Sequence, residues 1–228
     1  MIIVIASSKG GVGKSTKALA LGAALAARGG TVTIIDADPN QPIARWDART
    51  KEAGVTVERL NVISCTSKDE ILDTINEAAQ KTAFVIIDLE GTANMMVGYA
   101  ISQASLVLIP LQGSQLDADE AVKARKLVRQ QEQIANRSIP YVFAFTRTSV
   151  IEPRGFKHIR QQLKDAKLPA LSVPVSELEA YRIMFMVGGT VFDMADVDAP
   201  NLKGAQENAL AFSKAVTDLI ATNQKAAE

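Results

Sequence analysis

Several residue types are scarce in this 228-residue chain, and each scarcity excludes a class of site. The single cysteine, Cys65, leaves no partner for an intramolecular disulfide and rules out a cluster of cysteine ligands. The single histidine, His158, has no neighbour in sequence that would pair with it as ligand or base. No apolar run approaches the roughly 20 residues that a membrane-spanning helix needs. Net charge is zero, so attraction to nucleic acid or membrane requires a local patch.

The remaining composition is that of an ordinary globular protein. Hydrophobic residues make up 47% of the chain and charged residues 22%, and the length suits one core. The first residues, "MIIVIA", are apolar but have no charged leader before them. We therefore expect a single cytoplasmic domain over residues 1–228, with about the last six residues frayed and no stable membrane anchor.

Short apolar segments alternate with amphipathic segments along the whole chain. The apolar ones are rich in valine and isoleucine on both faces, which is typical of buried parallel strands. The pattern predicts the α/β class: a mostly parallel, twisted sheet with helices on both faces. The expected strands are 2–7, 31–38, 84–91, 105–111, 141–147 and 171–175, and the expected helices are 15–28, 68–81, 94–103, 115–135, 153–166, 177–187 and 205–222.

The first expected strand leads into a glycine-rich segment that nearly fits the phosphate-binding pattern G-x-x-x-x-G-K-[ST]. Ser8 stands where the first glycine of that pattern belongs. Glycines allow the backbone amides to approach a phosphate, and the helix that follows offers free N–H groups. We expect Lys14 to reach the β- and γ-phosphates and the Ser15 hydroxyl to ligate Mg²⁺. The candidate nucleotide-binding residues here are Gly10, Gly11, Val12, Gly13, Lys14, Ser15 and Thr16.

The same segment, "KGGVGKST", resembles the deviant Walker A motif K-G-G-x-G-K-[ST] of the ParA/MinD family of dimeric ATPases. In that family the first glycine is not required. The resemblance implies that the chain binds ATP and Mg²⁺ and forms a homodimer with ATP. It also implies that Lys9 extends to the partner subunit's phosphates, where a cation supplied in trans neutralises charge as an arginine finger does.

Two further segments carry the carboxylates of this resemblance. "IIDADPN", residues 34–40, is similar to the family's D-x-D-P-[QN] segment, which implies that Asp38 orients the attacking water and that Asp36 lies near the Mg²⁺. "FVIIDLEG", residues 84–91, has the Walker B form, in which Asp88 holds Mg²⁺ through a water. Many relatives have proline where this chain has Glu90. This extra carboxylate either binds the Mg²⁺ waters or faces solvent, and both alternatives stay open.

The later part of the chain resembles the base-binding region of small ParA-like partition ATPases. "AFTRTSV", residues 144–150, supplies Thr146 and Arg147 at the end of a strand. The stretch 174–194 follows the last strand, and the resemblance implies that Arg147 and Pro174 contact the nucleotide. Relatives often carry arginine where this chain has Leu178, a departure that bears on base or dimer contacts.

A basic stripe is predicted on the helix within 154–167. At about 100° per residue its cations fall on one arc, and Phe156, Ile159 and Leu163 form the adjoining apolar face. Such a stripe is either a site for nonspecific DNA phosphate contacts or an ordinary solvated face. The cations are Arg154, Lys157, Arg160, Lys164 and Lys167.

These features favour a partition-type ATPase that dimerises with ATP, binds DNA nonspecifically and is therefore nucleoid-associated when ATP-bound. A ParB-like adaptor would stimulate its hydrolysis, which we expect to be slow without that partner. One alternative is an accessory ATPase of conjugal transfer with the same chemistry and a different partner. The other is a MinD-like membrane-surface regulator, which we disfavour because the C-terminal helix has few cations and much alanine.

Overall fold

A computed structural model describes residues 1–7, 11–91, 94–112, 115–148, 154–195 and 199–225 of the chain. Its centre is a seven-stranded sheet with the order β3-β2-β4-β1-β5-β6-β7. Every strand pair is parallel, which confirms the predicted class. The strands are β1 (Ile2–Ile5), β2 (Val32–Ala37), β3 (Leu60–Ser64), β4 (Phe84–Leu89), β5 (Leu106–Leu111), β6 (Tyr141–Thr148) and β7 (Val175–Ser176).

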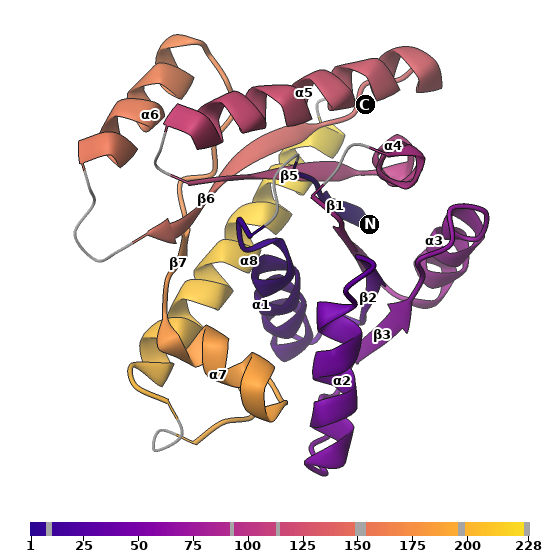
Figure 1. The fold of residues 1–228 in the computed structure, drawn as a ribbon, viewed down its shortest axis with the longest axis vertical. Helices are drawn as coiled ribbons and strands as arrows, with labels where there is room; N and C mark the ends of the chain where they lie inside the picture. Colours follow the sequence, from indigo (N-terminus) through magenta and orange to yellow (C-terminus); the bar gives the residue numbers. More distant parts are fainter. Residues whose placement is uncertain (8–10, 92–93, 113–114, 149–153, 196–198, 226–228) are drawn as a thin grey trace.

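Helices cover both faces of this sheet (Figure 1). One core, on the first face, packs apolar side chains of α1 (Lys14–Ala27), α2 (Pro42–Glu52), α7 (Glu179–Val187) and α8 (Leu202–Lys225). The core on the other face packs side chains of α3 (Ile71–Lys81), α4 (Met95–Gln103), α5 (Gln115–Ala135) and α6 (Arg154–Asp165). Strands β2 and β5 are buried at every position, because both of their faces are covered.

The sheet register brings the predicted functional strand ends together. Asp36 on β2 lies directly opposite Asp88 on β4, and Ile5 at the end of β1 is also paired with Asp88. Thr146 lies near the end of β6, on the other side of β1 and β5. Ligands of open parallel sheets bind outside the carboxyl ends of the strands, so this edge is where a site is expected.

The sequence analysis missed two elements, α2 and β3. Strand β3 is an edge strand whose residues are only half-buried or exposed, so it lacks the continuous apolar run of the central strands. Helix α2 buries only Ile43, Trp46 and Thr50. Both elements are stabilised by packing against the rest of the sheet, which local patterns do not report.

Several expected elements differ in extent from those observed, including the last strand and the last helix. Of the expected strand 171–175, only Val175 lies in β7, and the preceding chain touches β6 through one isolated bridge between Ala170 and Phe143. Helix α8 continues to Lys225, beyond the expected end at 222, and residues 226–228 lie outside the described part. Across the described ranges, no helix is both long and apolar enough to cross a membrane.

Candidate functional site

The turn between β1 and α1 has the backbone that phosphate binding requires. Gly11 and Gly13 have φ values of 74° and 81°, in the left-handed region that side chains disfavour. A Cβ at either position would meet nothing within 4 Å, so glycine is needed for conformation and not for space. The buried Val12 carbonyl accepts a hydrogen bond from Thr146 Oγ1 at 3.2 Å, which fixes the turn to β6. Lys9 and Gly10 were predicted to bind nucleotide but lie outside the described residues.

Helix α1 begins at Lys14 with an N-terminus that is suited to an anion. Its N-cap, Gly13, has no side chain, and the first turn contains no acidic residue. The N–H groups of this turn therefore have no side-chain cap, and the helix dipole adds positive potential. Lys14 is 6% exposed, while Ser15 and Thr16 are half-buried. The predicted phosphate-binding residues from Gly11 to Thr16 therefore share one turn.

Asp88 is a buried carboxylate at the end of β4. Its side chain is fully buried, and neither of its oxygens makes a well-formed hydrogen bond with a described residue, although the Ser15 hydroxyl lies close enough to affect it. Burial raises the pKa of Asp88 to about 7; the nearby Ser15 hydroxyl and Lys14 lower this pKa, whereas Asp36 and Asp38 raise it. An ionised carboxylate in such a place is costly unless a cation or its water compensates it.

Ser15 and Asp88 fit the Mg²⁺ that the sequence predicts. Mg²⁺ prefers oxygen ligands and keeps several waters, and it commonly uses one or two protein groups plus substrate phosphates. Asp88 offers unsatisfied oxygens beside the Ser15 hydroxyl. The described ranges hold no group of three or more histidine, cysteine, aspartate or glutamate side chains placed to bind one metal ion, so an all-protein metal cage is absent there.

Asp36 connects the sheet to α2. Its Oδ2 accepts hydrogen bonds from the backbone N–H groups of Ile43 and Ala44, both at 2.8 Å, and its Oδ1 accepts from the Asp38 N–H at 3.3 Å. Burial raises the pKa of Asp36, and these three hydrogen bonds partly offset the effect. Asp36 lies opposite Asp88 in the sheet, and its oxygens accept hydrogen bonds from the backbone, which places the segment that carries Asp38. Its predicted place near Mg²⁺ stays a prediction.

Asp38 lies half-buried between β2 and α2. Its Oδ1 accepts hydrogen bonds from the backbone N–H and the side-chain Nδ2 of Asn40, at 2.8 and 3.1 Å. The carboxylate is therefore oriented by its own loop, in the manner of an Asx turn. Asp36, Asp38 and Asp88 are electrostatically coupled, since both of the first two raise the pKa of Asp88.

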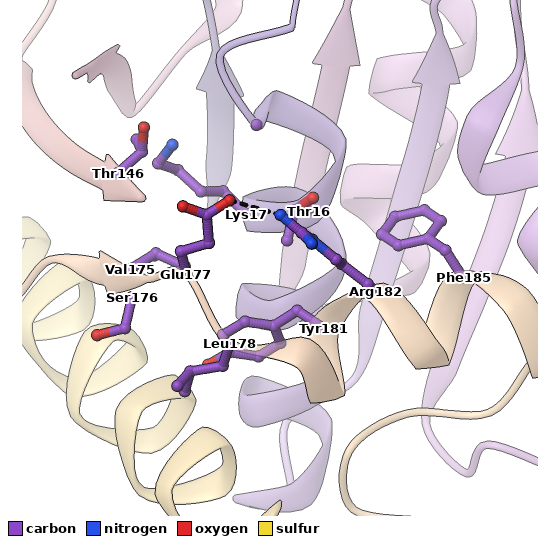
Figure 2. Close-up of a pocket in the computed structure, with 11 residues that line it drawn as sticks. Thr16, Lys17, Thr146, Val175, Ser176, Glu177, Leu178, Tyr181, Arg182 and Phe185 are labelled. Atoms are coloured by element: carbon purple, nitrogen blue, oxygen red, sulfur yellow. Dashed lines mark hydrogen bonds and ion pairs between the residues drawn. The ribbon is translucent and has the colours of Figure 1, made fainter. Parts of the chain in front are cut away.

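A pocket of about 270 Å³ lies next to the first turn of α1 (Figure 2). One wall comes from α1 and β6, and the other from β7 and α7. Arg182 and Glu177 form an ion pair across the second wall, with 2.7 Å between Nη2 and Oε1. The lining residues are Gly13, Thr16, Lys17, Thr146, Val175, Ser176, Glu177, Leu178, Tyr181, Arg182 and Phe185.

Comparison with known proteins identifies the family of this chain. The sequence matches the family model described as VirC1 protein over residues 1–222. The chain belongs to this family. A relative in the curated collection, the ParA protein of Rhizobium radiobacter, is 37% identical over 216 residues, which cover 94% of this chain and 95% of the relative. The predicted ParA/MinD-type resemblance is thereby confirmed.

Solved structures show the same fold. Apo McdA from Cyanothece has a TM-score of 0.74 at 17% identity, covering 94% of this chain and 98% of its own. A plasmid partition protein of Borrelia burgdorferi bound to AMPPNP has a TM-score of 0.66 at 23% identity, covering 93% and 98%. The VirC1-family chain thus shares its architecture with a protein whose structure holds a nucleoside triphosphate analogue.

In this VirC1-family chain, residues far along the sequence hold the second pocket wall. Asn208 on α8 donates to the Pro174 carbonyl at 2.9 Å and accepts from the Ser176 N–H at 3.1 Å. The Tyr181 hydroxyl donates to the Ala205 carbonyl at 2.8 Å. Sequence analysis missed Asn208, because only the fold brings α8 to this loop. Pro174 directly precedes the pocket-lining Val175, and its predicted contact with the nucleotide stays a prediction. The Arg147 side chain lies outside the described part.

Most of the predicted basic stripe lies on α6, away from the pocket and beside α5 (Figure 1). Lys167 was expected on the same helix but lies beyond its end at Asp165, with a φ of 52°. Phe156, Ile159 and Leu163 are buried, which confirms the predicted apolar face. The cations that the structure describes, Lys157, Arg160, Lys164 and Lys167, are all exposed, and the Arg154 side chain lies outside the described part.

Two other polar side chains, Glu90 and His158, each lie beside a residue four positions further along the chain. Glu90 is half-buried, and its Oε2 accepts from Asn94 Nδ2 at 3.5 Å, so the structure does not choose between its two predicted roles. His158 is exposed, and its Nε2 lies 3.1 Å from Gln162 Nε2.

Proposed function

We propose that this protein is a ParA-like ATPase that dimerises with ATP, binds DNA nonspecifically in that state and releases it on hydrolysis, to drive partition of a DNA or protein cargo. The observation that carries the proposal is the buried, unsatisfied Asp88 carboxylate beside Ser15 at an uncapped helix start. Family membership and the AMPPNP-bound relative support it. In this proposal the protein is cytoplasmic and associates with the nucleoid when ATP-bound.

Each predicted residue has a part in phosphoryl transfer. Ser15 and Asp88 would hold Mg²⁺, which would neutralise negative charge on the phosphates when bound. Lys14 binds the β- and γ-phosphates from its place in the first turn of α1. Asp38 orients the attacking water, and Lys9 of the partner subunit neutralises charge on the transferred group. Hydrolysis is slow in isolation, so a ParB-like adaptor must supply stimulation.

The nucleotide-binding part of the proposal is tested at Lys14. Lys14→Ala removes a buried cation, only 6% exposed, from the start of α1. Because this cation is proposed to bind the phosphates, we expect nucleotide affinity to fall by about 100-fold or more. Titration with a fluorescent ATP analogue measures the change. Lys68→Ala, which removes an exposed lysine elsewhere, is the matched control and should leave the affinity unchanged. Equal affinity of the Lys14→Ala variant and the parent protein contradicts the assignment.

The DNA switch is tested on the α6 stripe. We expect the protein to bind duplex DNA with ATP but not with ADP, and Arg160→Glu with Lys164→Glu to weaken that binding by about 10-fold or more and to flatten its salt dependence. Sedimentation with random-sequence DNA over a range of salt concentrations measures both effects. The matched control is Lys203→Glu with Lys225→Glu on α8, which makes the same charge change on exposed lysines of the opposite face.

Two outcomes would contradict the DNA switch. Binding that is equal with ATP and ADP would show that DNA association is not under nucleotide control. Equal loss in the α6 and α8 double variants would show that net charge matters and the position of the stripe does not.

A second cargo is proposed because the matched family model takes its name from VirC1 and not from a partition protein. In this alternative the same ATP-driven cycle serves conjugal transfer, and the partner is a DNA-processing complex. Capture of the ATP-bound protein's partners from its host distinguishes the two: a centromere-binding adaptor supports partition, and a relaxase supports transfer.

A further inference from the structure

Two parts of the candidate site are carried by two helices that are distant in sequence. Helix α7 supplies Tyr181, Arg182 and Phe185 to the pocket wall (Figure 2). Helix α2 begins directly after the Asp38 segment, and Asp36 binds its first turn through the Ile43 and Ala44 N–H groups. Any movement of α2 therefore moves the backbone on which Asp38 is placed.

Buried hydrogen bonds join these two helices. Trp46 on α2 donates its indole N–H to the carbonyl of Gly189, just after α7, at 2.8 Å. The Gly189 N–H donates to Thr50 Oγ1 at 2.9 Å, and the Thr50 hydroxyl donates to the Trp46 carbonyl at 2.8 Å. Trp46 is 1% exposed and Thr50 is 3% exposed, so water cannot replace these bonds.

The backbone at the end of α7 also lies directly against α2. Gly188 has a φ of 83°, and a Cβ on it would lie 2.7 Å from both Cα and N of Thr50. Only glycine permits this approach, for reasons of conformation and of space. Two backbones at such short range, with paired hydrogen bonds beside them, cannot slide independently.

We propose that Trp46, Thr50, Gly188 and Gly189, here named the α2–α7 clamp, make the position of Asp38 depend on what occupies the pocket. A base bound against α7 determines the position of that helix. Because the clamp joins α7 to α2, the position of α2, and with it that of Asp38, depends on the bound base. Trp46 and Thr50 are then positioning residues for hydrolysis. The phosphates bind at α1 and the base at α7, so loss of the clamp between α2 and α7 affects turnover more than nucleotide affinity. The inference rests on the proposed ATPase function.

The consequence is a form of base selection in the turnover step. The parent protein should hydrolyse ATP with a higher kcat than GTP, which carries the same phosphates on a different base. Thr50→Val keeps the side-chain volume but leaves the buried Gly189 N–H without an acceptor. We expect this variant to lose about 10-fold in kcat for ATP, to approach its own kcat for GTP, and to keep KM for ATP within about 2-fold.

Phosphate release with ATP and with GTP measures kcat and KM for each protein. The matched control is Thr74→Val on α3, because the Thr74 hydroxyl likewise donates to the carbonyl four residues earlier, that of Glu70, at 2.9 Å. This control should retain the ATP-to-GTP kcat ratio. Trp46→Phe, which removes the indole donor, is the second variant and should lower the ratio in the same way if Thr50→Val does not fold.

Each outcome decides the inference. Equal kcat for ATP and GTP in the parent protein overturns it, as does a clamp variant whose ATP-to-GTP ratio is unchanged, whether or not its Tm has fallen. A lower ratio in Thr50→Val or Trp46→Phe, with Thr74→Val unaffected, supports it. Parent protein that hydrolyses neither nucleotide, alone or with host extract, would instead remove the proposed ATPase function.

Discussion

Asp88→Asn is expected to stabilise the nucleotide-free protein above pH 7 and to abolish Mg²⁺-dependent nucleotide binding. Burial raises the pKa of Asp88 from 3.8 to about 7 in the folded protein. Between pH 3.8 and about 7, Asp88 is protonated in the folded state and ionised in the unfolded state. Protonation of Asp88 therefore contributes fully to stability below about pH 4, and this contribution is lost as the pH rises through about 7. Above that pH the folded chain carries a buried charge, at a cost on the order of 4 kcal/mol.

Asparagine keeps the shape of the side chain and has no charge at any pH. The expected stabilisation by Asp88→Asn is therefore a few kcal/mol at pH 8 and shrinks towards pH 4. Urea unfolding of both proteins between pH 4 and pH 8, without nucleotide, measures it. Asp69→Asn, the same change in an exposed turn, is the control and should show no such trend. A stability difference between the Asp88→Asn variant and the parent that does not change with pH contradicts the assignment of a buried charge to Asp88.

The same substitution tests the metal site in the opposite sense. An asparagine amide cannot supply the negative charge that a carboxylate offers Mg²⁺. Nucleotide affinity that depends on Mg²⁺ in the parent protein should therefore lose that dependence in Asp88→Asn. Asp88 would thus destabilise the nucleotide-free protein and stabilise the complex with Mg²⁺ and nucleotide, a combination that is frequent at functional sites. An affinity that still rises with Mg²⁺ would place the metal on other residues.

The parts of the fold that sequence predicts are those where local pattern and tertiary environment agree. β1, β2, β4 and β5 are covered on both faces, so each is a run of apolar residues that only a buried parallel strand explains. The apolar face of α6 was also predicted, because the helical spacing of its apolar residues agrees with the side of the helix that packs on the core. Helix α2 and strand β3 lie at the margin of the sheet and bury few side chains, so their patterns are weak.

The candidate site divides in the same way. The phosphate turn, Asp38 and Asp88 follow directly from short motifs, because their chemistry needs fixed residue types at adjacent positions. Asn208 and the α2–α7 clamp cannot be predicted from such motifs. Asn208 contacts Pro174, 34 residues away, and the clamp joins Trp46 to Gly189, 143 residues away. A tryptophan or threonine on a polar helix carries no local sign of its partner. Such supporting contacts can be found only once the chain is folded.

Asp38→Ala is expected to retain ATP and to lower its hydrolysis by about 100-fold, because the group that orients the attacking water is lost. Among the described residues the Asp38 carboxylate accepts hydrogen bonds from Asn40 and none from α1, so the phosphate turn should remain intact. Uncleaved ATP should then hold two protomers together, and light scattering should report a dimer with ATP and a monomer with ADP. Adding Lys9→Ala removes the cation proposed to act across the interface, and the dimer should dissociate.

Turnover of Asp38→Ala at the parent rate would remove Asp38 from its role, and a monomer in the presence of ATP would exclude the shared site. The two results are independent, because orientation of water and contact between subunits rest on different residues.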